Sequence, residues 1–281
     1  MKYLVIYRQR EKYPVATMCA FFEVSRSGYY DFVRRMDRPD RDKPLAIAIA
    51  QCQERSRKTY GYRRVHIWLR REYGLVMNPK TVLRVMRKYG LLSDIRRRRK
   101  YWQMGQQLHK YENLLNRNFY ADRPNQKWVT DISYIQTSQG ILYLSAIRDL
   151  YDNSIVAYQT GTEQTINLVT NTIRAAKAKE AVTAELQLHS DQGFQYTSRA
   201  YHNLTKEYGI TPSMSRRGNC LDNAPAENFF GILKSECINR QKIKDFATAK
   251  SLIDEYIYFY NHERIQLKTK LTPLELRRQS A

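Results

Sequence analysis

Three carboxylates stand at positions that packing alone does not favour. Asp131 interrupts an apolar run typical of a β-strand, 128–134, where an unpaired acid costs desolvation energy. Asp191 follows a short apolar stretch, and Glu227 comes just after Pro225, which suits a first helical turn. Three carboxylates at one sheet edge favour oxygen-seeking cations such as Mg²⁺ or Mn²⁺. Two such ions about 4 Å apart can drive an in-line phosphoryl displacement.

Each acid also has a purely structural interpretation. Asp191 could cap a turn, Glu227 could favour a helix N-terminus through the helix dipole, and Asp131 could pair with an arginine. For each acid taken alone, the structural interpretation is favoured over a catalytic one. Together, on a basic chain with no other catalytic constellation, the three acids predict one site. We therefore expect Asp131, Asp191 and Glu227 to be the catalytic residues and the metal ligands, with two Mg²⁺ or Mn²⁺ ions per active site.

An α/β domain would position these acids. The hydrophobic pattern predicts strands at 128–135, 141–147, 154–158, 186–189 and 210–214, and helices at 164–180, 198–208, 224–240 and 246–260. This order predicts a mixed five-stranded sheet with flanking helices. Thr272 to Glu275 is typical of a helix capping box. We expect the aromatic residues to be core, namely Trp128, Tyr134, Tyr256, Tyr258, Phe259 and Tyr260.

The front of the chain is predicted to be all-helical. Residues 14–35 suggest a helix-turn-helix, although two packed helices without DNA contact fit equally well. Three more helices are expected, the first from Leu45, the second after Tyr60-Gly61-Tyr62, and the third from Asn78-Pro79.

Positive charge is concentrated in that front part. Residues 1–120 hold 28 basic and 10 acidic side chains, whereas residues 121–281 hold 20 and 17, and the whole chain carries +21. Such asymmetry predicts a polyanionic partner bound mainly by the first part. The run Arg96-Arg97-Arg98-Arg99-Lys100 is either a solvated linker or a tether that neutralises backbone phosphates, and we favour the tether.

Several protein classes are excluded or disfavoured. The four cysteines form no C-x-x-C pair, so the sequence does not support a zinc ribbon or a thioredoxin-like motif. No Gly-rich phosphate loop is present, and no apolar run approaches the roughly 20 residues that span a bilayer. The N-terminus does not resemble a signal peptide. We expect a cytoplasmic, nucleoid-associated protein.

The short sequence motifs around the three acids resemble those of a known family. The 35 residues between Asp191 and Glu227 match the D-35-E interval of the retroviral-integrase-like DDE recombinases. The segments 128–134, 189–196 and 215–227 resemble those of insertion-sequence-three transposases, specifically their second-frame (OrfB) product, as do 60–64 and 260–264. Leu221, Pro225 and Gln266 depart from the common pattern without affecting the three acids.

The resemblance implies an RNase H-like catalytic core preceded by an all-α DNA-binding region with helix-turn-helix elements. It implies Mg²⁺-dependent 3′-end cleavage and strand transfer at insertion-sequence ends, by a copy-out, paste-in route. Expected partners are double-stranded DNA at element ends and target, further copies of the chain, and the upstream reading-frame product. Lys234, seven residues after Glu227, is an expected DNA contact. Each expected contact could instead be an ordinary surface residue. The other expected contacts are Arg216, Arg217, Arg63, Arg64, Arg96, Arg97, Arg98, Arg99 and Lys100.

The expected division of the chain has five parts. They are an N-terminal helical segment (1–40), a helical DNA-binding domain (41–95), a basic linker (96–120), the DDE core (121–240) and a C-terminal helical extension (241–281). One alternative is a DNA-binding regulator or partner subunit that is active only when fused to the upstream reading-frame product. A retroviral-type integrase is disfavoured because its His-His-Cys-Cys zinc module requires paired cysteines that this sequence lacks.

Overall fold

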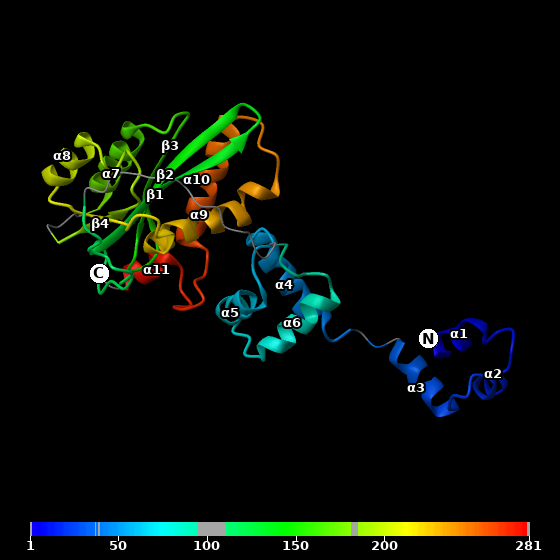
Figure 1. Ribbon diagram of the computed structural model, residues 1–281. Coiled ribbons are helices and arrows are strands. Elements are labelled where there is room, and N and C mark those ends of the chain that lie inside the picture. Colours follow the sequence, from blue (N-terminus) through cyan, green and yellow to red (C-terminus); the bar gives the residue numbers. More distant parts are fainter. Residues whose placement is uncertain (1, 37, 39, 95–110, 181–184, 280–281) are drawn as a thin grey trace.

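The first part of the chain is a small three-helix unit. The computed structural model describes residues 2–36, 38, 40–94, 111–180 and 185–279. Helices α1 (Lys2–Gln9), α2 (Val15–Phe21) and α3 (Arg26–Met36) enclose a cluster of their own, and they lie apart from the rest in Figure 1. The buried members of that cluster are Ile6, Met18, Cys19 and Tyr29. The sequence analysis predicted α2 and α3 but missed α1.

Helices α2 and α3 are joined by a tight turn. Glu23 takes a left-handed conformation, with φ of 54°, and the Val24 amide donates to the Cys19 carbonyl at 2.9 Å. The Ser25 hydroxyl accepts from the Gly28 amide at 3.1 Å and so caps α3. A Cβ on Gly28 would lie 2.3 Å from the Tyr3 hydroxyl, so the Tyr3 side chain would have to move to admit a larger residue. The two helices predicted within residues 14–35 and the turn between them are therefore present, and a role in DNA binding stays a prediction.

The second part contains α4 (Lys43–Arg55), α5 (Tyr62–Tyr73) and α6 (Pro79–Lys88). The Asn78 side chain caps α6 by accepting from the Lys80 amide at 2.8 Å, as the Asn-Pro pair predicts. Gly74 ends α5 with a φ of 64°. The apolar faces of the three helices meet in a core that includes Ile49, Val65, Leu69, Val82 and Val85.

The third part contains the predicted mixed five-stranded sheet. Its strands are β1 (Lys127–Thr137), β2 (Gly140–Asp149), β3 (Ile155–Gly161), β4 (Gln187–Ser190) and β5 (Thr211–Met214), in the order β3-β2-β1-β4-β5. The first three strands form an antiparallel meander, and β4 and β5 run parallel to β1. This is the RNase H-like arrangement that the resemblance implied. A short 3-10 helix, η1 (Cys220–Asn223), leads into α9 (Ala224–Glu236).

Helices cover both faces of the sheet (Figure 1). On one face, α7 (Ile166–Lys179) and α8 (Arg199–Glu207) pack on a cluster that contains Trp128, Ile147 and Leu188. On the other face, α9 and α10 (Phe246–His262) pack on Ile135 and Leu144. The chain continues through η2 (Ile238–Arg240) between these two helices and ends with α11 (Pro273–Arg278), which has the predicted capping box at Thr272.

The second part docks on the C-terminal segment of the third. The Tyr60 hydroxyl donates to the Glu263 carbonyl and accepts from the Ile265 amide, both at 2.9 Å. Arg64 Nε donates to the Ile265 carbonyl at 3.0 Å. Ion pairs Arg55–Glu263, Arg57–Glu255 and Arg71–Glu275 surround this contact, and one apolar cluster runs through both parts. The two segments that resemble the family at 60–64 and 260–264 thus bind each other.

Two expectations about aromatic residues are wrong. Trp128, Tyr256 and Tyr260 are buried as predicted, but Tyr134 is 61% exposed and Tyr258 is 60% exposed. Burial in the second half of β1 alternates from Ser133 onward, and Tyr134 falls on the uncovered face. Within the described residues no helix is long and apolar enough to cross a membrane.

Candidate active site

Asp131 and Asp191 are brought together by two paired strands. β1 and β4 are parallel neighbours, and Val129 on β1 pairs with His189 on β4. Asp131 lies on β1 two residues beyond this pair, and Asp191 is the first residue after β4, so both lie at the same edge of the sheet. This register makes them neighbours although 59 residues separate them in sequence.

Glu227 is brought to these aspartates by α9. It lies in the first turn of that helix, which packs against β1. Ala226, the preceding residue, is buried in a cluster with Val129 and Leu150. The Asn223 side chain donates to the Thr130 carbonyl at 3.1 Å, immediately beside Asp131. Helix α9 therefore begins at a fixed point on β1.

The backbone near each aspartate holds one of its oxygens. Asp131 Oδ1 accepts from the Ile132 amide at 2.7 Å, and Asp191 Oδ1 accepts from the Gly193 amide at 2.9 Å. A Cβ on Gly193 would lie 3.0 Å from Asp191 Oδ1, so a larger residue there would crowd the carboxylate. The turn after β4 thus fixes the orientation of Asp191.

The three acids disfavour one another's ionisation. Burial raises the pKa of Asp131 well above its usual range, and the negative charges of Asp191 and Glu227 raise it further. Burial likewise raises the pKa of Asp191, and burial together with the Asp191 charge raises the pKa of Glu227. Lys234 opposes the shift at Asp131 but does not reverse it. The group therefore has an excess of negative charge that bound cations would relieve.

A buried tyrosine lies beneath the aspartates. Tyr196 is fully buried, and its hydroxyl lies 3.4 Å from the Thr130 hydroxyl, one residue before Asp131. Burial and the charges of Asp131 and Asp191 raise the pKa of Tyr196, so it stays a neutral phenol. Tyr196 was not predicted to have a role in the site. It was noted only as part of the segment 189–196 that resembles the family, and no other feature of the sequence singles it out.

The residues suit hard divalent cations by their chemistry. All three donors are carboxylates, the ligands that Mg²⁺ and Mn²⁺ prefer, and they interact electrostatically. Among the described residues, no group of three His, Cys, Asp or Glu side chains lies in a geometry that could hold a metal ion. The three carboxylates fit such ions by their chemistry and would have to move closer together to share one.

Lys234 lies near the acids as predicted. It is half-buried on α9, and its ammonium nitrogen is 4.4 Å from the centroid of the Tyr134 ring. That distance is within the range of a cation–π interaction. The Coulombic effect of Lys234 on Asp131 places its charge close to the acids.

The other predicted DNA contacts have different surroundings. Arg63 and Arg217 are exposed. Arg64 is directed at the Ile265 carbonyl, and Arg216 is paired with Asp222. The run from Arg96 to Lys100 lies outside the described residues. Their DNA contacts all remain predictions.

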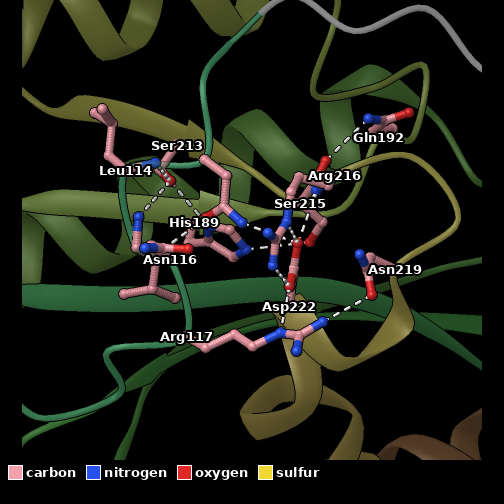
Figure 2. A network of polar contacts seen from close by, with 12 residues as sticks. Leu114, Asn116, Arg117, His189, Gln192, Ser213, Ser215, Arg216, Asn219 and Asp222 are labelled. Atoms are coloured by element: carbon pink, nitrogen blue, oxygen red, sulfur yellow. Dashed lines mark hydrogen bonds and ion pairs between the residues drawn. The ribbon is translucent and has the colours of Figure 1, made fainter.

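A polar network that was not predicted from the sequence links β4 and β5 to the loop before α9 (Figure 2). His189 is buried, with its two ring nitrogens 2.8 and 3.1 Å from the hydroxyls of Ser213 and Ser215. Burial lowers the pKa of His189 to about 4. Asp222 is fully buried and binds the side chains of Arg216 and Arg117.

Comparisons with known proteins agree with this geometry. Family models described as "Integrase core domain" match residues 121–220 and 227–280, and a model described as "HTH-like domain" matches residues 39–99. The chain is 39% identical over 277 residues to the putative transposase InsK for insertion sequence element IS150 of Escherichia coli (strain K12), covering 98% of both chains. It is 31% identical over 264 residues to the transposase InsF for insertion sequence IS3A of the same organism, covering 92% of this chain and 91% of the relative.

The similarity to solved structures is more distant. The HTLV-2 integrase catalytic core domain has a TM-score of 0.46 at 13% identity, and the match covers 56% of this chain and 99% of that one. The sequence relatives, in contrast, match along nearly the whole length. The chain belongs to the insertion-sequence-three family of transposases, as an OrfB-type product, and is an enzyme of the DDE transposase and integrase class.

Proposed function

We propose that this transposase performs Mg²⁺-dependent 3′-end cleavage and strand transfer at the ends of its insertion sequence by a two-metal mechanism. The observation that carries the proposal is the β1–β4 register, which sets Asp131 and Asp191 side by side near Glu227. No other group of acids in the described part of the chain combines burial, mutual repulsion and so little cationic compensation. A phosphodiester is the substrate that such a site and a basic front region suit.

The three acids have related roles in this proposal. Asp131 and Asp191 would hold both ions between them, and Glu227 would hold one. When bound, the ions activate the attacking oxygen and stabilise the leaving oxygen. Water is the nucleophile in cleavage and a DNA 3′-hydroxyl in joining, so no side chain forms a covalent bond to DNA. Lys234 binds a phosphate beside the scissile bond, and the neutral Tyr196 keeps bulk water from the floor of the site.

The helical parts bind DNA in this proposal. The exposed Arg63 and the basic run 96–100 contact phosphates, which gives affinity but little sequence specificity. The helix-turn-helix of α2 and α3 is a candidate for base contacts in the major groove. The five-part division of the chain at residues 40, 95, 120 and 240 belongs to the same proposal. So do assembly of at least two copies on DNA and a nucleoid-associated, cytoplasmic location.

The test is cleavage and joining of a labelled duplex that carries the terminal sequence of the element. With Mg²⁺ or Mn²⁺ the chain should nick one 3′ end and join it to a second duplex, and Asp131→Ala and Glu227→Ala should do neither. Full activity in either variant would refute the proposal. Arg123→Ala, an exposed change away from the acids, is the matched control and should keep its activity.

A second candidate function is a DNA-binding subunit that becomes active only when fused to the upstream reading-frame product. One observation favours it: four arginines of the α4–α6 part, Arg55, Arg57, Arg64 and Arg71, contact the C-terminal segment, so part of the positive charge of this part is paired within the chain. If the chain alone binds element ends but never cuts them, while the fusion cuts them, this candidate replaces the first.

A further inference from the structure

The loop between β5 and α9 determines where Glu227 lies. Residues 215–219 leave β5, and η1 passes directly into α9, whose first turn carries Glu227. A displacement of this loop is therefore transmitted to the third acid without an intervening hinge. This loop is exposed and carries two arginines and a glycine, so its shape depends on contacts with the rest of the domain.

Asp222 holds the loop from inside. It is fully buried and accepts three hydrogen bonds from Arg216, one from the amide at 3.0 Å and two from the guanidinium at 2.9 Å. It also accepts from Arg117 Nε at 2.8 Å and from Asn113 Nδ2 at 2.9 Å. A carboxylate is buried at tolerable cost only with such compensation. The loop therefore keeps its shape because its own acid is bound from several directions.

The two ends of the loop contact the strands that carry the aspartates. On the Asp191 side, the Ser215 amide donates to the Ser190 carbonyl and Gln192 donates to the Ser215 carbonyl, both at 2.9 Å. On the Asp131 side, Asn223 donates to the Thr130 carbonyl at 3.1 Å. Asp222 thus lies in a segment that is fastened next to both aspartates and continues into Glu227.

Arg117 reaches Asp222 from a distant part of the sequence, and its backbone is fixed for this purpose. Asn116 and Arg117 both have left-handed conformations, with φ of 41° and 61°. Two consecutive non-glycine residues in that region cost about 1–2 kcal/mol each. The Ser213 hydroxyl holds the segment by accepting from the Leu114 and Leu115 amides at 3.0 and 3.2 Å. Arg117 Nη2 also donates to the Asn219 side chain at 2.7 Å (Figure 2).

We propose that Arg117 and Asp222 are positioning residues, which hold the 215–223 loop so that Glu227 lies at the distance from Asp131 and Asp191 that divalent ions require. The inference rests on the proposed function. It also gives Arg216 an intramolecular role, since its guanidinium makes two of the hydrogen bonds that hold the loop. Arg117 and Asp222 touch neither substrate nor ion in this account.

The experiment compares Arg117→Ala with the wild-type chain. Two quantities are measured: the Mn²⁺ and Mg²⁺ concentrations that give half-maximal cleavage, and those that give half-maximal thermal stabilisation of the DNA-free chain. Loss of a residue that orients metal ligands weakens metal affinity by about 10–100-fold. Arg117→Ala should therefore raise both midpoints by about tenfold. Arg117→Lys, which keeps the charge but not the fork that reaches Asn219, should fall in between.

Arg277→Ala is the matched control. Arg277 also pairs with fully buried carboxylates, Asp149 and Asp152, but it lies on α11 and does not contact the 215–223 loop. It should lower the thermal midpoint without changing either ion midpoint. If Arg117→Ala behaves in the same way, the positioning role is refuted. If the wild-type chain neither binds ions nor cleaves DNA, the proposed function itself is wrong and the inference falls with it.

Discussion

Two acidic groups in the same domain, one partly buried and one fully buried, have opposite electrostatics. At Asp131, Asp191 and Glu227, burial raises every pKa, the charge of Asp191 adds to the shift at Asp131 and Glu227, and Lys234 opposes the shift at Asp131. At Asp222, five residues before Glu227, hydrogen bonds from Arg216 and Arg117 outweigh burial and lower the pKa. Burial alone therefore does not identify a functional carboxylate. Missing compensation does, because it leaves negative charge that only a ligand can neutralise.

The largest expected effect tests the uncompensated group. Asp131→Asn should lower cleavage by at least about a hundredfold, since even an outer-shell change at a metal site costs up to that much. It should not destabilise the metal-free chain, because it removes a buried charge that its neighbours repel. Cleavage rates and urea unfolding of the same preparation measure both effects. If Asp131→Asn is inactive because it is unfolded, Asp131 contributes to stability as Asp222 does, and the contrast between the two acidic groups is wrong.

The compensated group should respond in the opposite way. Asp222→Asn should lower the free energy of unfolding at pH 7 by about 2 kcal/mol, the scale of hydrogen bonds to a charged group, reduced here because both arginines are partly exposed. The pKa of Asp222 is lower in the folded chain than its usual 3.8. Its stabilisation is thus complete above that value and is lost as the pH falls below it.

Urea unfolding at several pH values measures this dependence. The difference between the wild-type chain and Asp222→Asn should stay constant from pH 7 to about pH 5 and shrink below about pH 4. A difference that grows on acidification would mean that Asp222 is not held as a carboxylate. The comparison between the two acidic groups would then lose its basis.

A smaller effect is expected at Lys234, a cation beside the three acids. The exposed Tyr134 ring holds Lys234 by a cation–π contact, which is worth about 0.5–1 kcal/mol at such a site. Tyr134→Ala should therefore weaken DNA-end binding by about two- to fivefold, and Tyr134→Phe should retain most of it. Fluorescence anisotropy with an end duplex gives both values. Equal losses in the two variants would show that the hydroxyl, not the ring, matters.

The smallest effect should come from an exposed pair. Arg57 and Glu255 contact at 2.8 Å between the α4–α6 part and α10, and Arg57 lowers the pKa of Glu255. Exposed pairs contribute about 0.2–1 kcal/mol, so Arg57→Ala should change the free energy of unfolding by less than about 1 kcal/mol. Thermal unfolding with and without added salt measures it. If Arg57→Ala lost as much free energy of unfolding as Asp222→Asn, the contribution of a charged pair to stability would not depend on its burial.

The three acids of the proposed site could be singled out from the sequence because their signals are local. An aspartate inside a strand pattern, another at the end of a strand and a glutamate at a helix start are each visible within a few residues, as are the caps at Asn78 and Thr272. Helix α1 was missed because its short apolar run has no cap signal and was judged only as a possible leader.

The rest of the site depends on tertiary contacts. Arg117 and Asp222 are 105 residues apart, and nothing near either residue indicates the pairing. Tyr134 was placed in the core because it is aromatic, whereas the alternation of β1 leaves it exposed on the face opposite to Ile135. Likewise, Arg64 resembles a DNA contact in sequence, and only the docking of α5 on the segment around Ile265 shows another partner for it.

Titration of the DNA-free chain with Mn²⁺, followed by calorimetry, tests the central claim most directly. The wild-type chain should bind ions, and Asp191→Asn should lose most of that binding while remaining folded. Binding in Arg277→Ala should match the wild type. Equal Mn²⁺ binding by the wild-type chain and Asp191→Asn would contradict the claim that the uncompensated carboxylates form the metal site.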